Sequence, residues 1–157
     1  MRPFPVIALF CEDIREEKTG LRTLIGVLPD NVIAGSVPGL LPKLFCYFHI
    51  HLDLESDVRQ IKARIKFPGG PILEAANFDE LIEATKAEAK AQGTPFAGLM
   101  AHIGVVPAPI QQLGRIEAFV EVDGTEYLCG TLNLIQPATA SIASAPPFGQ
   151  SPRASAD

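Results

Sequence analysis

Long stretches of this sequence alternate apolar and polar side chains with a period of two, and that period is typical of β-strands rather than helices. Residues 58–67 give the clearest example, because basic and amide side chains separate the apolar ones. The apolar positions are Ile61, Ala63, Ile65 and Phe67. Residues 44–54 alternate as well, but both faces are apolar in the first half, which predicts cover on both sides there. Such segments bury one sheet face against another layer.

Turn residues divide the rest of the chain into further strands. The predicted strands cover residues 6–17, 21–27, 32–34, 72–76, 96–106, 115–122 and 127–135, with loops such as residues 35–42 between them. Because strands follow one another through turns, the predicted fold class is mainly β, an antiparallel two-layer β-sandwich of about 7–8 strands. Asp123-Gly124 predicts a two-residue hairpin that would set Glu121 opposite Glu126. That like-charge pair is unfavourable, so a longer loop is the alternative.

One segment, residues 77–92, breaks the β pattern and predicts an amphipathic helix in a connection between the two halves. Its apolar stripe at helical spacing is Phe78, Leu81, Ile82, Thr85 and Ala89. Asn77 is predicted to cap the first turn and Gly93 to end the helix. Lys86 and Lys90 are expected toward the negative end of the helix dipole.

The chain has 157 residues and a formal net charge of −5. Its length predicts one β-rich domain, residues 1–136, and the Pro/Ala/Ser-rich residues 137–157 predict a disordered tail. The negative charge argues against nucleic acid and anionic membranes as partners. No apolar stretch approaches the ~20 residues that span a bilayer, and the N-terminus lacks the pattern of a signal peptide. We therefore expect a cytoplasmic protein whose three cysteines are buried, reduced thiols.

Three histidines and one aspartate are the candidate metal ligands. His49, His51 and Asp53 would project from the same face of one strand, and imidazole and carboxylate groups can share a metal ion. His102 would add a fourth ligand if its strand lies beside this one. An ordinary exposed or packed histidine pair explains the same spacing.

A basic stripe formed by Arg59, Lys62, Arg64 and Lys66 is the candidate anion-binding surface. A solvated sheet face explains this stripe as well. The segment from Cys11 to Arg15 combines a thiol, acids and a cation, but no histidine follows nearby to activate the thiol. Phosphate-binding loops and the common hydrolase, zinc and calcium motifs are absent from the sequence. The sequence therefore predicts no cofactor and favours a protein without enzymatic activity.

Residues 8–15, read as Ala-Leu-Phe-Cys-Glu-Asp-Ile-Arg, and the later Leu24-Ile25-Gly26-Val27 and Leu41-Pro42-Lys43-Leu44 segments support a resemblance. They resemble an uncharacterised bacterial family of small β-rich proteins, over about the first third of the chain. The resemblance implies a β-rich fold and supplies no chemistry.

Three functions follow as expectations. The first is a non-enzymatic β-sandwich that binds another protein, of its host or of its own kind. The alternative is a metal- or small-ligand-binding protein, enzymes included, that uses the strand face of His49, His51 and Asp53. The weaker alternative is anion or nucleic-acid binding through Lys62 and its basic neighbours.

Overall fold

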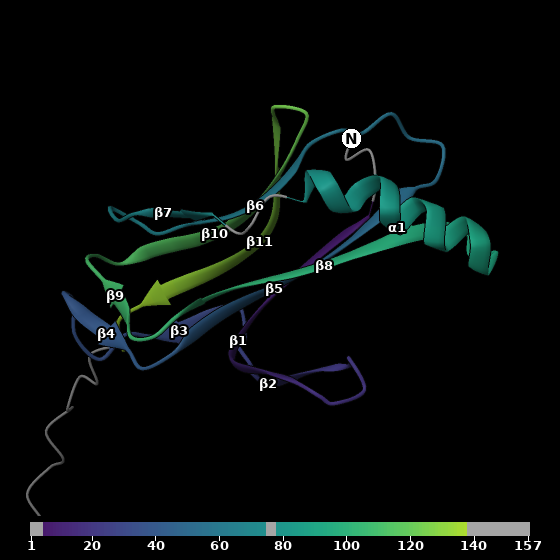
Figure 1. Ribbon diagram of the computed structural model, residues 1–157. Coiled ribbons are helices and arrows are strands. Elements are labelled where there is room, and N and C mark those ends of the chain that lie inside the picture. Colours follow the sequence, from purple (N-terminus) through teal and green to yellow (C-terminus); the bar gives the residue numbers. More distant parts are fainter. Residues whose placement is uncertain (1–4, 75–77, 138–157) are drawn as a thin grey trace, which may run out of the picture.

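The structure is a computed structural model that describes residues 5–74 and 78–137. These residues form eleven strands and one helix (Figure 1). The elements are β1 (Val6–Glu16), β2 (Arg22–Val27), β3 (Asn31–Ile33), β4 (Gly39–Leu41), β5 (Leu44–Asp53), β6 (Ile61–Lys66), β7 (Ile72–Glu74), α1 (Asp79–Gln92), β8 (Phe96–Val105), β9 (Ala108–Ile110), β10 (Gly114–Val122) and β11 (Thr125–Ile135).

Two sheets enclose the core. Sheet A has the strand order β2-β1-β5-β8, and sheet B has the order β3-β11-β10-β6-β7. One hydrophobic cluster joins the inward side chains of both sheets, and its fully buried members include Phe48 and Ile50 from sheet A and Ile65 and Ile116 from sheet B. The helix α1 connects β7 of sheet B to β8 of sheet A. The predicted mainly-β, sandwich-like fold with one helix in a connection is confirmed.

Two pairings were not predicted. The strand β3 runs parallel to β11, whereas every other strand pair among the described residues is antiparallel. Residues 35–42 are not only a loop, because β4 lies within them and pairs with β9 as a separate two-stranded sheet. Pro38 and Pro42 are typical of a loop, and the strand that pairs with this segment is distant in the sequence, so the pairing left no local pattern.

The β10–β11 hairpin has the register that the two-residue turn predicts. Val122 faces Thr125, and Glu121 faces Glu126. Asp123 and Gly124 both have positive φ, as a tight hairpin turn of this kind requires. The Asp123 carboxylate also accepts hydrogen bonds from the backbone N–H groups of Arg59 and Gln60. Those bonds hold the chain just before β6, which begins at Ile61 rather than at the predicted residue 58.

The helix begins and faces the core differently from the prediction. Its N-cap residue is Phe78, without a side-chain cap, and Asn77 lies outside the described residues. Gly93 ends the helix in the left-handed conformation, as predicted. The buried helix residues are Ile82, Lys86 and Ala89. Leu81, predicted on the buried stripe, is 53% exposed, because the helix is turned so that Lys86 faces inward.

Candidate functional site

The outer face of sheet A gathers apolar side chains and all three histidines of the chain. Two adjacent rows cross β1, β5 and β8: Ile7, His49 and Met100 in one, and Leu9, Tyr47 and His102 in the other. Phe45 extends this surface at one end, and His51 and Phe96 extend it at the other. We call these nine residues the histidine face.

The histidine face exposes large apolar groups without formal charge. Ile7 and Met100 are each 47% exposed, Phe96 is 44% exposed and Leu9 is 37% exposed. Scattered apolar residues are common on protein surfaces, but contiguous ones mark sites of interaction. Here the strand register makes them contiguous, because Ile7 and Met100 flank His49 directly.

Glycines on β8 make room for two rings of β5. A Cβ atom added to Gly98 would lie 3.2 Å from Nε2 of His49, and one added to Gly104 would collide with the ring of Phe45. Each ring therefore lies over the backbone of β8 at a glycine, in space that a larger residue would fill.

His49 and His51 form a close pair. Their ring centroids are 4.3 Å apart in an edge-to-face arrangement, and the ring of His51 stacks on Phe96 at 4.4 Å. Nε2 of His51 is buried and has no hydrogen-bond partner among the described residues. Burial, and secondarily the neighbouring His51, lower the pKa of His49 below its ordinary value. The neutral imidazole is thus the favoured form of His49 at this surface.

The four candidate metal ligands do not form one group. Asp53 accepts a hydrogen bond from the N–H of Glu55 in the turn after β5. His102 lies opposite Tyr47 and near the ring of Phe45, in a different row from His49. Among the described residues, no three His, Cys, Asp or Glu side chains are placed to hold a metal ion together.

The basic stripe lies on the outer face of sheet B, where acidic side chains surround it. The Arg64 guanidinium contacts the carboxylates of Glu74 at 2.9 Å, Glu121 at 2.6 Å and Glu126 at 3.1 Å. Lys62 lies opposite Glu121 across the strand pair. These carboxylates raise the pKa of Arg64 further, with Glu74 contributing most. The carboxylates already take up the N–H groups of Arg64 that would otherwise bind a phosphate.

Lys66 and Arg59 complete the stripe at its two ends. Lys66 lies opposite Glu117 in the β6–β10 pair. Arg59 lies at the other end, next to a pocket between α1 and the segment after β5.

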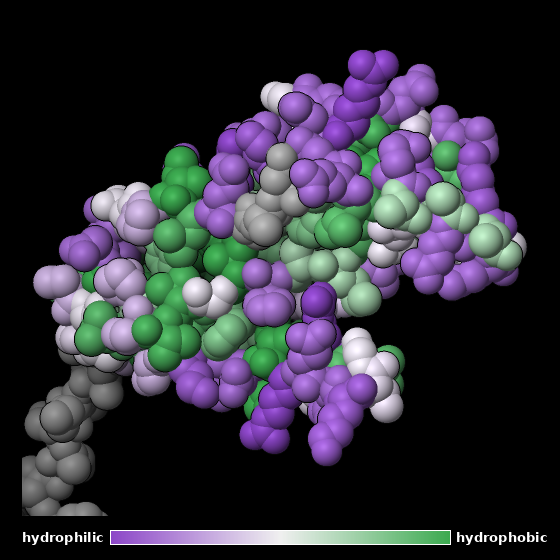
Figure 2. Space-filling view, viewed as in Figure 1, coloured by the Kyte–Doolittle hydropathy of each residue, from purple (hydrophilic) through white to green (hydrophobic). Residues whose placement is uncertain are grey.

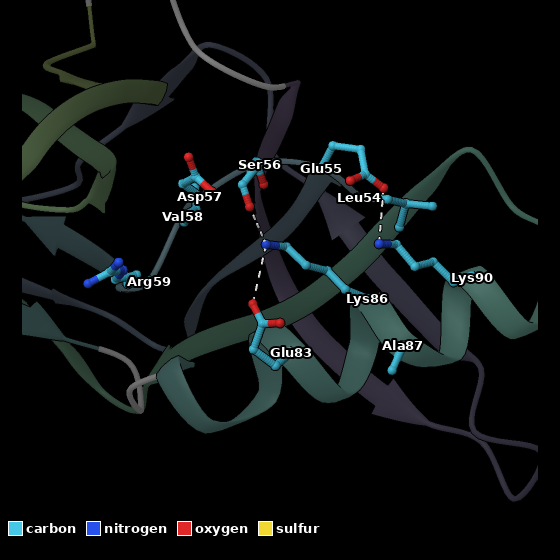
Figure 3. A pocket seen from close by; sticks show the side chains of 10 residues that line it. All are labelled: Leu54, Glu55, Ser56, Asp57, Val58, Arg59, Glu83, Lys86, Ala87 and Lys90. Atoms are coloured by element: carbon cyan, nitrogen blue, oxygen red, sulfur yellow. Dashed lines mark hydrogen bonds and ion pairs between the residues drawn. The ribbon is translucent and has the colours of Figure 1, made fainter.

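That pocket, of about 380 Å³, is a second candidate site (Figure 3). Three basic and three acidic side chains line it, so its formal charges balance: Arg59, Lys86 and Lys90 against Glu55, Asp57 and Glu83. Nζ of Lys86 donates to the Ser56 carbonyl at 2.6 Å and approaches Glu83 at 3.4 Å. Lys90 pairs with Glu55 at 3.0 Å. The two lysines tie the helix to the chain beneath it, which is a structural role.

The cysteines come together although they are far apart in the sequence. Cys11 and Cys46 are fully buried, whereas Cys129 is only partly buried, so the predicted burial holds for two of the three. Burial raises the pKa of Cys46 well above its ordinary value, and the nearby Cys11 and Cys129 thiols raise it further. None of the three forms a disulfide with another described residue. A raised pKa keeps Cys46 in its unreactive protonated form.

The β1–β2 hairpin borders the histidine face. Figure 2 shows this hairpin and α1 as largely hydrophilic projections from the body with open space between them. Arg22, at the start of β2, acts electrostatically on Tyr47, whose pKa burial raises and Arg22 lowers in part. Nε and Nη1 of Arg22 are buried without a hydrogen-bond partner among the described residues. Sequence reasoning missed Arg22, because a single arginine in a short strand gives no pattern.

Comparisons with protein-family models, with curated proteins and with solved structures give no match for this chain. The described residues contain no helix that is long and apolar enough to cross a membrane.

Proposed function

We propose that this protein binds another protein chain through the histidine face and has no catalytic activity of its own. The observation that carries the proposal is the uncharged, contiguous row formed by Ile7, His49 and Met100 across three neighbouring strands, with its two outer members about half exposed. Burying apolar area of this kind is the main driving force of protein association.

The composition of the histidine face supports this proposal. Aromatic residues and methionine are enriched at the centres of protein interfaces, and charged residues are depleted there. Tyr47 and the imidazoles add polar groups beside the apolar ones, so a partner can be held by hydrogen bonds as well as by burial. The outer face of sheet B differs, because its cations and carboxylates satisfy one another around Arg64.

The test compares the wild type with one double variant and one single variant, both chosen to preserve the strands. Ile7→Thr/Leu9→Thr removes apolar surface from the histidine face, and Ile72→Thr removes it from β7 of sheet B, where Ile72 is 62% exposed. Proteins captured from a bacterial lysate by the wild type are identified, and each is purified and titrated against all three forms by calorimetry. We expect a partner whose affinity falls at least about tenfold for the double variant and is unchanged for Ile72→Thr.

Equal affinities for all three forms would contradict the proposal, provided that the variants unfold at the same urea concentration as the wild type. Elemental analysis of protein purified without a histidine tag or chelator tests the competing metal hypothesis. About one equivalent of a transition metal per chain, lost in His49→Ala/His51→Ala, would favour a metal site over a protein-binding face.

A further inference from the structure

The strand β8 is an unprotected border of sheet A. It pairs with β5 on one side only, over ten residues without a charged residue or a proline. The other border strands are short or carry charge: β2 contains Arg22, β7 contains Glu74, and β3 has three residues. Proteins usually protect long border strands with charge, proline or cover, because unpaired backbone groups attract another strand.

The helix α1 lies near β8 but leaves part of it open. A pocket of about 350 Å³ separates the helix from the beginning of the strand. Its walls include Thr85, Glu88 and Gln92 from α1, and Phe96 and Gly98 from β8. The backbone of β8 is therefore accessible beside the helix, where a further strand can enter.

We propose that β8 pairs antiparallel with β8 of a second copy of this chain, so that the two copies of sheet A form one continuous sheet. This inference goes beyond the proposed function, because the contact is made by the border of sheet A and not by the histidine face. A strand pair of this type is held by main-chain hydrogen bonds, and its register is set by the side chains that meet across it.

The sequence of β8 is complementary to itself about Met100. Consider an antiparallel pair in which Met100 faces Met100 of the second copy. Each of the remaining opposed pairs then joins one larger and one smaller residue. These pairs are Phe96 with Gly104, Ala97 with Ile103, Gly98 with His102, and Leu99 with Ala101. Residues opposed in an antiparallel pair lie on the same face, so the outer residues meet outer residues and the core residues stay inside.

Neighbouring registers lack this property. Centring the pair on Ala101 sets Leu99 against Ile103 and leaves Gly98 against Gly104. Centring it on Leu99 sets Phe96 against His102. Packing is best where a large side chain meets a small one, and the core-side pairs Ala97 with Ile103 and Leu99 with Ala101 meet this condition only about Met100. On the outer face, the rings of His49 and Phe45 already cover Gly98 and Gly104, so the core-side pairs set the register.

Charge also favours this seam over other surfaces. Each chain has a formal net charge of −5, so two copies repel each other where acidic surfaces meet. No formal charge lies on β8, and like charges are therefore not opposed within the seam. Pairing about a two-fold axis perpendicular to the sheet also joins the two histidine faces into one larger apolar surface on the same side.

The test measures the molar mass of the full chain by sedimentation equilibrium from micromolar to millimolar concentration. We expect a dimer for the wild type. Met100→Lys and Met100→Glu each place two like charges opposite each other, so each should weaken the dimer at least about tenfold. An equal mixture of these two variants should restore dimerisation, because Lys then faces Glu. Leu9→Lys, two strands away on β1, tests whether the copies meet through their histidine faces instead. Ile72→Lys, on β7 of sheet B, is the matched control and should leave the dimer intact.

A wild type that stays monomeric throughout would overturn the pairing and leave the proposed function to be judged on its heterologous partner. A dimer that Leu9→Lys disrupts and the Met100 mixture fails to restore would also overturn it, because the copies would then meet through the histidine faces. Circular dichroism and urea unfolding of each variant distinguish loss of association from loss of folding.

Discussion

Arg64 makes the tight β10–β11 hairpin compatible with two facing glutamates. Glu121 and Glu126 are directly opposed, which destabilises a strand pair when no cation lies between them. The guanidinium contacts both carboxylates and that of Glu74 as well. The same residue that suggested an anion site in the sequence is thus a structural cation. Its role depends on β6 and β10 being neighbours, which local sequence patterns do not reveal.

Replacing Arg64 with methionine should therefore lower the free energy of unfolding by about 1 kcal/mol, because three exposed or half-exposed ion pairs are lost and two carboxylates then repel each other. Urea unfolding at low salt measures the loss, which should shrink at high salt. Lys66→Met, on the same face of β6, is the control and should change stability less. An equal loss for the two variants would show that Arg64 is an ordinary surface charge.

His49 gives the protein a dependence of stability on pH. Its pKa is lower in the folded state than in the unfolded chain, because burial and the adjacent His51 disfavour the charged imidazole. The unfolded state therefore binds the proton more readily, and stability should fall as the pH drops through about 6.5, the ordinary value for histidine. This loss of stability stops once the pH is below the pKa of His49 in the folded state, because His49 is then protonated in both states. Ile7, Tyr47 and Met100 are further neighbours of His49, and none of them carries charge in this range.

Urea unfolding between about pH 7.5 and pH 5 measures this slope. His49→Gln should reduce it, and His102→Gln, which leaves the His49–His51 pair in place, should retain it. The depressed pKa of Asp13, caused mainly by its hydrogen bond from Lys43, acts at lower pH and does not contribute here. The same slope in His49→Gln as in the wild type would contradict the assignment.

Lys86 shows how an element can be predicted correctly while its orientation is not. The buried Nζ donates to the Ser56 carbonyl, so the helix is fastened to the segment after β5 through its polar side. Lys86→Met keeps the length of the side chain but leaves that carbonyl without its donor, and should cost about 1–2 kcal/mol in urea unfolding. Lys90→Met, one turn later, removes an exposed pair with Glu55 and should change stability by less than ~0.5 kcal/mol. Equal effects would contradict the role given to Lys86.

Elements with many residues could be predicted from the sequence, and their neighbours in space could not. The alternation in β5 and β6 identified both strands and their buried faces. Asp123-Gly124 indicated the register that the last hairpin adopts, although the facing glutamates left a longer loop as the alternative. The short strands β4 and β9 were missed, because their pairing joins distant segments. In the candidate site, the sequence placed His49 and His51 on one face. Nothing in the sequence indicated that Ile7 and Met100 flank His49, because that depends on the order of the strands in the sheet.

At the scale of the whole molecule, the core formed by the described residues extends as far as Leu134. The last residue of the hydrophobic cluster is Leu134, and β11 ends at Ile135. The cluster draws on both sheets and on α1, so the cohesion of the domain depends on contacts among residues up to that point. The segment after residue 136 was predicted to be a tail, and the described part of the core reaches its full extent without it.

A chain that ends at residue 136 should therefore fold as the full chain does. Its free energy of unfolding should differ by less than ~0.5 kcal/mol, because every core side chain of the described residues is kept. Urea unfolding followed by circular dichroism measures this, and the binding of an apolar dye reports whether the histidine face becomes more exposed. A larger loss of stability would show that the last residues belong to the domain. Unchanged stability with a marked rise in dye binding would instead show that the tail covers the histidine face, which would make the tail a competitor of any partner.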